Sequence, residues 1–196
     1  MLDGLKNVLQ NGNFLLLMII FFFGLGIFNA VTTWIEDIVR PRGFSITQAG
    51  VAGGLMIVGG VVGALVLPGL SDHYRRRVPF ILIAVAGASL GLVGVTFALS
   101  QVLLYTSAFL MGFFLLAAGP VGFQYGAEIA RPTPEGTSNG LLLLMGQISG
   151  IVFIFGMDAF KSANGSMTPS LVVLTLLLLL SLGLSSRLRE AERLGG

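Results

Sequence analysis

Polar side chains recur at helical spacing inside the apolar stretches of this 196-residue sequence. Asn29 and Thr32 fall on one face of the first stretch, because residues three and four apart share a side of a helix. Gln124 interrupts a later stretch, and Asn139 and Gln147 share a broad face of the next. A side-chain amide can hydrogen-bond a hydroxyl, and polar groups at membrane depth must face protein or a water-filled cavity. The pattern indicates a polar interior that binds a solute.

Six apolar segments carry these residues, and each is long enough to cross the hydrocarbon core as a helix. The sequence is 55% hydrophobic and 10% charged, with a mean hydropathy of +0.93, whereas a soluble domain is about a quarter charged. No alternation typical of a membrane barrel occurs. We therefore expect an all-α, polytopic membrane bundle forming a single domain over residues 1–196. The predicted spans are 13–35, 46–68, 79–99, 102–126, 137–158 and 169–185.

Enzyme chemistry is disfavoured by what the sequence lacks. It contains no cysteine and one histidine, and an intramembrane enzyme would need a buried nucleophile with its base or a metal cluster. No cofactor and no metal site are expected. The sequence pI near 9.4 is not interpreted as a nucleic-acid signal, because the placement of the basic residues matters more than their total.

Basic residues are distributed unequally between the two sides of the predicted bundle. The two tails and the second and fourth loops together hold eight of them, namely Lys6, Arg75, Arg76, Arg77, Arg131, Arg187, Arg189 and Arg193. The opposite side holds three, Arg40, Arg42 and Lys161. Because Lys and Arg are enriched in cytoplasmic loops, we expect an integral protein of the plasma or inner membrane with both termini in the cytoplasm.

Charged residues also cluster where the predicted helices meet the cytoplasm. The segment that starts at Pro68 is expected to be a loop, and in it Asp72 precedes Arg76 and Arg77. A later junction adds the charged residues Glu128, Arg131 and Glu135. Charge-assisted hydrogen bonds across helix ends would hold a cytoplasmic gate shut and break when the bundle rocks. An alternative is that the arginines only fix topology, and charge alone does not separate the two.

Glycine pairs at GxxxG spacing occur on four predicted helices. They are Gly59/Gly63, Gly87/Gly91, Gly122/Gly126 and Gly146/Gly150. Small residues at this spacing let helices approach closely in lipid. The four pairs predict a compact bundle.

The segment with Leu70, Ser71, Asp72, Arg76 and Arg77 resembles the loop signature of the major facilitator superfamily. That resemblance implies a fold of about twelve helices in two six-helix halves, of which this chain would be the C-terminal half. A second stretch, 128–142 followed by Gln147, is similar to the feline leukaemia virus subgroup C receptor-related branch. Members of that branch move choline, ethanolamine and related small amines.

The resemblance implies a site as well as a fold. The glutamine that lines the substrate cavity in that branch aligns with Gln147, and aromatic faces could contact a cation. The cavity candidates are Phe28, Asn29, Thr32, Gln124, Tyr125, Asn139 and Gln147. The expected partners are a small-molecule substrate, the lipid bilayer and a second six-helix bundle, either a missing N-terminal half or a second copy. The alternative is a non-transporting membrane receptor or assembly subunit.

Overall fold

The computed structural model describes residues 2–162 and 164–191. The described residues form helices and turns and contain no strand. In chain order the helices are α1 (Leu2–Gln10), α2 (Gly12–Thr33), α3 (Ile35–Val39), η1 (Arg40–Arg42), α4 (Ile46–Tyr74), α5 (Val78–Phe97), α6 (Gln101–Ile129), α7 (Glu135–Ala159) and α8 (Thr168–Ser185).

Six of these helices, α2 and α4 to α8, are long and apolar enough to span a membrane. They coincide with the six predicted spans, which confirms the all-helical membrane fold. The prediction of a loop from Pro68 is wrong for residues 68–74, because α4 continues through Pro68 to Tyr74. A proline inside a helix removes one backbone hydrogen bond, and the helix tolerates that loss here. The chain then turns at Arg75, whose φ of 52° lies in the left-handed region.

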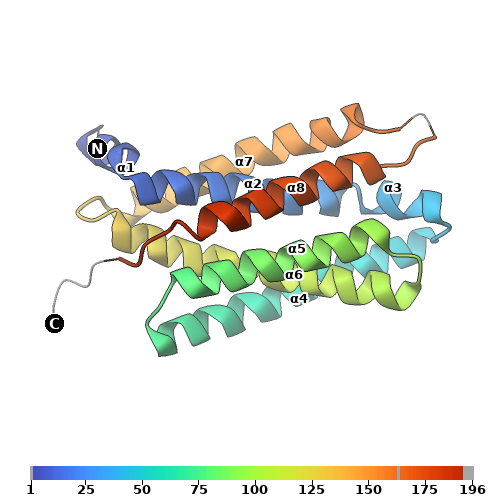
Figure 1. Cartoon of the computed structure of the whole chain (residues 1–196), viewed down its shortest axis with the longest axis horizontal. Coiled ribbons are helices and arrows are strands. Elements are labelled where there is room, and N and C mark those ends of the chain that lie inside the picture. The colour runs from blue at the N-terminus through green and yellow to red at the C-terminus, as the bar shows by residue number, and fades with distance from the viewer. Residues whose placement is uncertain (1, 163, 192–196) are drawn as a thin grey trace.

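The long helices form two groups that lie side by side (Figure 1). In one group α6 packs against α4 and α5, and in the other α2 packs against α7 and α8. Contacts of α5 with α8 and of α2 with α6 join the groups. The start of α1 and the described residues that follow α8 lie at the same end of the bundle in Figure 1. We call this the terminal end and the opposite one the far end.

Glycines allow the closest helix crossings, as their spacing predicts. A Cβ built on Gly63 would overlap the carbonyl oxygen of Phe113, so α4 and α6 meet backbone to backbone. A Cβ on Gly112 would likewise overlap the carbonyl oxygen of Met56. All four predicted glycine pairs lie against a neighbouring helix: Gly59, Gly63 and Gly91 face backbone atoms, and the other paired glycines face side chains.

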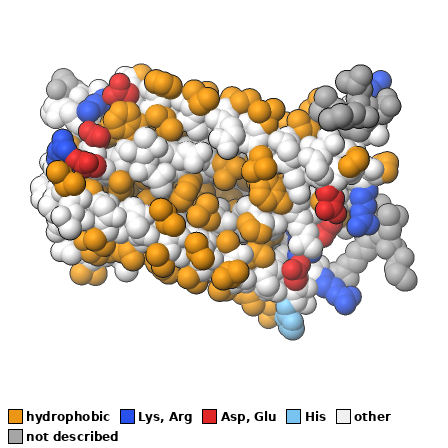
Figure 2. All heavy atoms as spheres, turned by 180° about the vertical axis from the view of Figure 1, so that it is seen from behind, with side chains coloured by type: hydrophobic (Ala, Val, Ile, Leu, Met, Phe, Trp, Pro, Cys, Tyr) orange, Lys and Arg blue, Asp and Glu red, His pale blue; other side chains and the backbone are white. Residues whose placement is uncertain are grey.

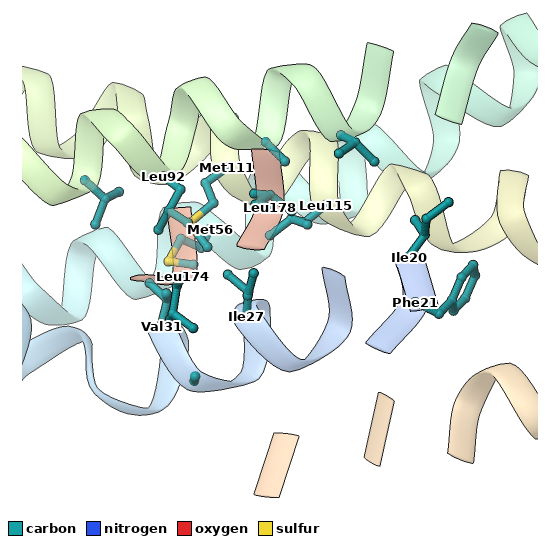
Figure 3. Close-up of a cluster of buried hydrophobic side chains, with 14 of the residues drawn as sticks. Ile20, Phe21, Ile27, Val31, Met56, Leu92, Met111, Leu115, Leu174 and Leu178 are labelled. Carbon is teal, nitrogen blue, oxygen red and sulfur yellow. The ribbon is translucent and has the colours of Figure 1, made fainter. Parts of the chain in front are cut away.

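The hydrophobic core lies between the two groups of helices. Figure 3 shows Met56, Met111, Leu92, Leu174 and Val31 meeting in its middle, and all five are buried. Charged side chains gather at the two ends of the molecule, with a broad band lacking them in between (Figure 2). This distribution is the one that a protein crossing the hydrocarbon core requires.

Candidate functional site: a charged cluster and an exposed polar face

Arg77 is the centre of a charged cluster at the terminal end. Its side chain is 10% exposed, and its Nη1 donates to the Asp72 carboxylate at 2.5 Å and to the Ser71 hydroxyl at 3.0 Å. Its Nε and Nη2 both lie 3.1 Å from Oε1 of Glu128. Two of the predicted gate residues, Asp72 on α4 and Glu128 on α6, therefore both contact a third, Arg77 in the α4–α5 turn.

The guanidinium of Arg77 keeps its charge in this setting. Burial lowers the pKa of Arg77, but the hydrogen bonds and negative charges of Asp72 and Glu128 outweigh it, and the pKa is raised overall. The planar guanidinium can donate charge-assisted hydrogen bonds to several acceptors at once, as Arg77 does here. The cluster ties the end of α4 to the end of α6.

Sequence reasoning missed the part that the C-terminal tail plays in this cluster. The Glu190 carboxylate accepts hydrogen bonds from the backbone N–H groups of Arg77 and Val78, at 3.1 to 3.2 Å. The Tyr125 hydroxyl donates to the Arg189 carbonyl at 2.6 Å, and the Arg189 N–H donates to the Asn13 side chain at 3.3 Å. The tail thus joins α2, α5 and α6, and its only sequence signal was an acidic residue after a helix.

The remaining gate candidates are not brought together by the chain. Arg76, Arg131 and Glu135 are exposed at the terminal end, and no ion pair joins their side chains to another described residue. Arg76 contributes only its backbone, whose carbonyl accepts from the Ser71 hydroxyl at 2.6 Å. The three exposed side chains are accessible for ion pairs with another bundle.

Gln147 lies at the midpoint of α7, twelve residues from each end, and its side chain is exposed. Its amide makes no hydrogen bond with another described residue. Gln124 is also exposed, on α6, nearer the terminal end. An exposed amide at membrane depth is costly against lipid. The positions of both glutamines are therefore unsuited to face hydrocarbon.

Three other predicted cavity residues, Asn29, Thr32 and Asn139, are half-buried. Asn29 is half-buried and packs against Gly150 of α7. Thr32 bonds the carbonyls of Phe28 and Asn29 within its own helix, at 2.7 and 3.1 Å. The side-chain oxygen of Asn139 is buried and has no hydrogen-bond partner among the described residues.

Tyr125 and Phe28 are placed differently from the glutamines. The Tyr125 side chain is fully buried at the terminal end, where it supports the tail, and Phe28 packs against the core. An aromatic group that sequence reasoning passed over joins α2 to α7: the ring of Phe153 lies 5.6 Å from that of Phe22 and 6.3 Å from that of Phe23. The three adjacent phenylalanines 21–23 were its sequence signal.

A hollow between α2, α5, α6 and α8 contains none of the predicted site residues. Apolar side chains and glycines line it, including Phe21, Gly24, Leu115 and Gly122. Among the described residues no group of three or more His, Cys, Asp or Glu side chains is placed to hold a metal ion.

Comparison of the sequence with known proteins identifies the family of this chain. Residues 2–154 match the family model described as Major Facilitator Superfamily. An uncharacterized protein of Archaeoglobus fulgidus is 29% identical over 177 residues, which are 90% of this chain and 82% of that protein. The choline/ethanolamine transporter FLVCR1 of Felis catus is 31% identical over 154 residues, 76% of this chain and 27% of that protein.

A solved structure shows the same fold. The D-xylose-proton symporter matches 92% of this chain and 48% of its own, with a TM-score of 0.65 and 16% identity. The chain thus spans about half of that symporter, about a quarter of the feline transporter and most of the archaeal protein. With a family model matching most of its length, this six-helix membrane chain belongs to the Major Facilitator Superfamily.

Proposed function

We propose that the chain is one half of a transporter that moves a small hydroxylated amine, of the choline or ethanolamine kind, by alternating access. It works together with a second six-helix bundle, and the solute passes between the two. The observation that carries the proposal is the exposed amide of Gln147 at the midpoint of α7. The feline choline/ethanolamine transporter supports the choice of solute.

The polar groups proposed to act together with Gln147 are suited to such a solute. A glutamine carbonyl accepts a hydrogen bond from the hydroxyl that choline and ethanolamine share, and Gln124 and Asn29 supply further amides. The aromatic rings at the α2–α7 contact offer negative faces to the ammonium group. The binding residues proposed for this half are therefore Gln147, Gln124, Asn29 and Asn139, with Phe28 and Thr32 behind them.

Alternating access requires contacts that form in one state and break in another. The Arg77 cluster supplies them at the terminal end, where Asp72, Arg77 and Glu128 lock α4 to α6. We place this end, and with it both termini, in the cytoplasm, because it carries most of the basic loops. Transport involves no bond-breaking chemistry, and the proposal assigns the chain no enzymatic role and no cofactor.

The experiment is uptake of tritiated choline and ethanolamine into liposomes that hold the purified chain. We expect saturable uptake, with Gln147→Ala reducing it at least tenfold, since the amide is the proposed hydroxyl partner. Ile148→Ala, on the neighbouring exposed position of α7, is the matched control and should leave uptake unchanged. Tetramethylammonium lacks the hydroxyl and should compete poorly.

Two results would overturn this assignment. One is saturable uptake that Gln147→Ala leaves intact, which would remove the glutamine from the site. The other is the absence of choline and ethanolamine uptake by a folded chain whose second bundle has been supplied, which would exclude this solute class.

A further inference from the structure

Three features of the single chain remain uncovered on the faces of α4 and α7. The Gln147 amide is exposed at the midpoint of α7, and Arg76 and Glu135 are exposed at the terminal end without an ion pair to a described residue. In Figure 1 α7 and α4 lie at opposite edges of the bundle, with the other long helices between them. A partner that covers both edges must therefore contact two separate surfaces.

Each of the two surfaces ends in an exposed charge, and the two charges are opposite in sign. Arg76 is the second residue after the end of α4, and Glu135 is the first residue of α7. Both lie at the terminal end, so a second copy in the same orientation brings Arg76 of one chain to the level of Glu135 of the other when α4 of one copy packs against α7 of the other. A two-fold axis along the membrane normal then forms this pair twice, because an isologous interface repeats every contact.

The surfaces also match in depth. Leu65 lies nine residues before the end of α4, and Leu144 lies nine residues after the start of α7. Both are about 13 Å from the terminal end at the helical rise per residue, and both are exposed. Gly69 and Gly140 lie five residues from the same ends, and neither has an atom near the position of an added Cβ. Room for close helix approach therefore exists at equal depth on both surfaces.

The archaeal relative indicates where the second bundle comes from. This chain covers 82% of that protein, so the relative is only slightly longer and also has room for about six spans. From these observations we infer that the second bundle is a second copy of this chain, with α4 of each copy packed against α7 of the other. The inference rests on the proposed two-bundle transporter, to which each copy contributes one Gln147 amide.

Cysteine cross-linking tests the pairing, since the chain has no native cysteine. Chains with Leu65→Cys and Leu144→Cys, carrying different tags, are mixed in liposomes at low protein density and oxidised. We expect a cross-link between the two tags. Leu90→Cys on α5, which is 73% exposed, is the control and should give none. No mixed product, or an equal yield in the control, would overturn the inference.

Charge reversal tests the pairing independently of cysteine geometry. Arg76→Glu or Glu135→Arg alone should lower the cross-linking yield severalfold, and the two reversals together should restore it. If each single reversal lowers the yield and the double reversal does not restore it, Arg76 and Glu135 do not form an ion pair at the interface.

The inference and the proposed function can fail separately. Cross-linked dimers that do not take up choline or ethanolamine would support the second copy as the partner bundle and contradict the proposed solute. Uptake by chains that stay monomeric in the same liposomes would support the proposed solute and contradict the inference that the partner bundle is a second copy.

Discussion

Glu190 caps the backbone of Arg77: its two carboxylate oxygens lie 3.1 and 3.2 Å from the Arg77 nitrogen. The same carboxylate accepts from Val78, the first residue of α5. A helix start leaves N–H groups unpaired and carries partial positive charge, and no side chain from the α4–α5 turn caps this one. The tail carboxylate therefore stabilises α5 at the residue that also centres the charged cluster.

Replacing Glu190 should release the tail from the bundle. Glu190→Gln keeps the shape but removes the charge that the start of α5 favours, and we expect a loss of stability of about 1 kcal/mol, as for other cap removals. Trypsin should cut at Arg187 and Arg189 several times faster in this variant than in the parent chain. Limited proteolysis in detergent, followed by mass spectrometry, measures both cuts.

Asp158→Asn is the matched control for this experiment. Asp158 is an exposed carboxylate at the far end, so its neutralisation should leave cleavage of the tail unchanged. Equal cleavage of the parent chain and Glu190→Gln would show that the cap does not hold the tail.

Arg77→Lys should weaken the charged cluster although it conserves the charge. The guanidinium bonds Ser71, Asp72 and Glu128 in three directions, and a single ammonium cannot reproduce that fork. We expect a loss of about 1 kcal/mol, the upper value for ion pairs whose carboxylates are partly exposed. Thermal unfolding in detergent measures it, with the exposed Arg131→Lys as control.

The pH dependence of this effect has a definite sign. Because the pKa of Arg77 is raised in the folded state, its pairing contributes its full stabilisation at every pH below the pKa of arginine in the unfolded chain. That stabilisation is lost only as the pH rises through the pKa of Arg77 in the folded chain. The destabilisation by Arg77→Ala should therefore stay constant from neutral to moderately alkaline pH. A decline of the effect across that range would contradict the persistent charge.

Most of the fold was predictable because each span is an apolar run bounded by polar residues. The end of α4 was not, since local sequence favours a stop at Pro68 while the buried Ser71 and the Arg77 cluster hold the next turn in helical form. The end of α2 is also set by tertiary contact. Trp34 closes the helix, and its indole N–H donates to the carbonyl of Ile154 on α7 at 3.0 Å.

The polar positions of the candidate site could be identified from the sequence, and their role in binding a solute stays a prediction. A polar residue such as Gln147 at the middle of an apolar run indicates a special surface whatever the packing. The placement of Tyr125 was not predictable, because its hydroxyl meets a tail carbonyl 64 residues away. The Glu190 cap joins residues 113 positions apart, and no local pattern specifies such a contact.

The orientation of the chain can be measured with single cysteines. Asn164→Cys lies in the loop between α7 and α8 at the far end, and His73→Cys lies in the last turn of α4 at the terminal end. In intact cells an impermeant maleimide should label Asn164→Cys and spare His73→Cys until the membrane is opened. The reverse pattern would place the termini outside.

Gly63→Ala should destabilise the bundle because the added methyl group would overlap the carbonyl oxygen of Phe113 where α4 crosses α6. Backbone cannot move aside as a flexible side chain can, so we expect a loss of about 1–3 kcal/mol, the usual cost of overpacking. Gly183→Ala on α8 is the control: nothing lies near its added Cβ, and alanine's higher helix propensity should leave that variant equally or more stable. Thermal unfolding of both variants in one detergent measures the contrast, and equal stability would mean that α4 and α6 are not in backbone contact at Gly63.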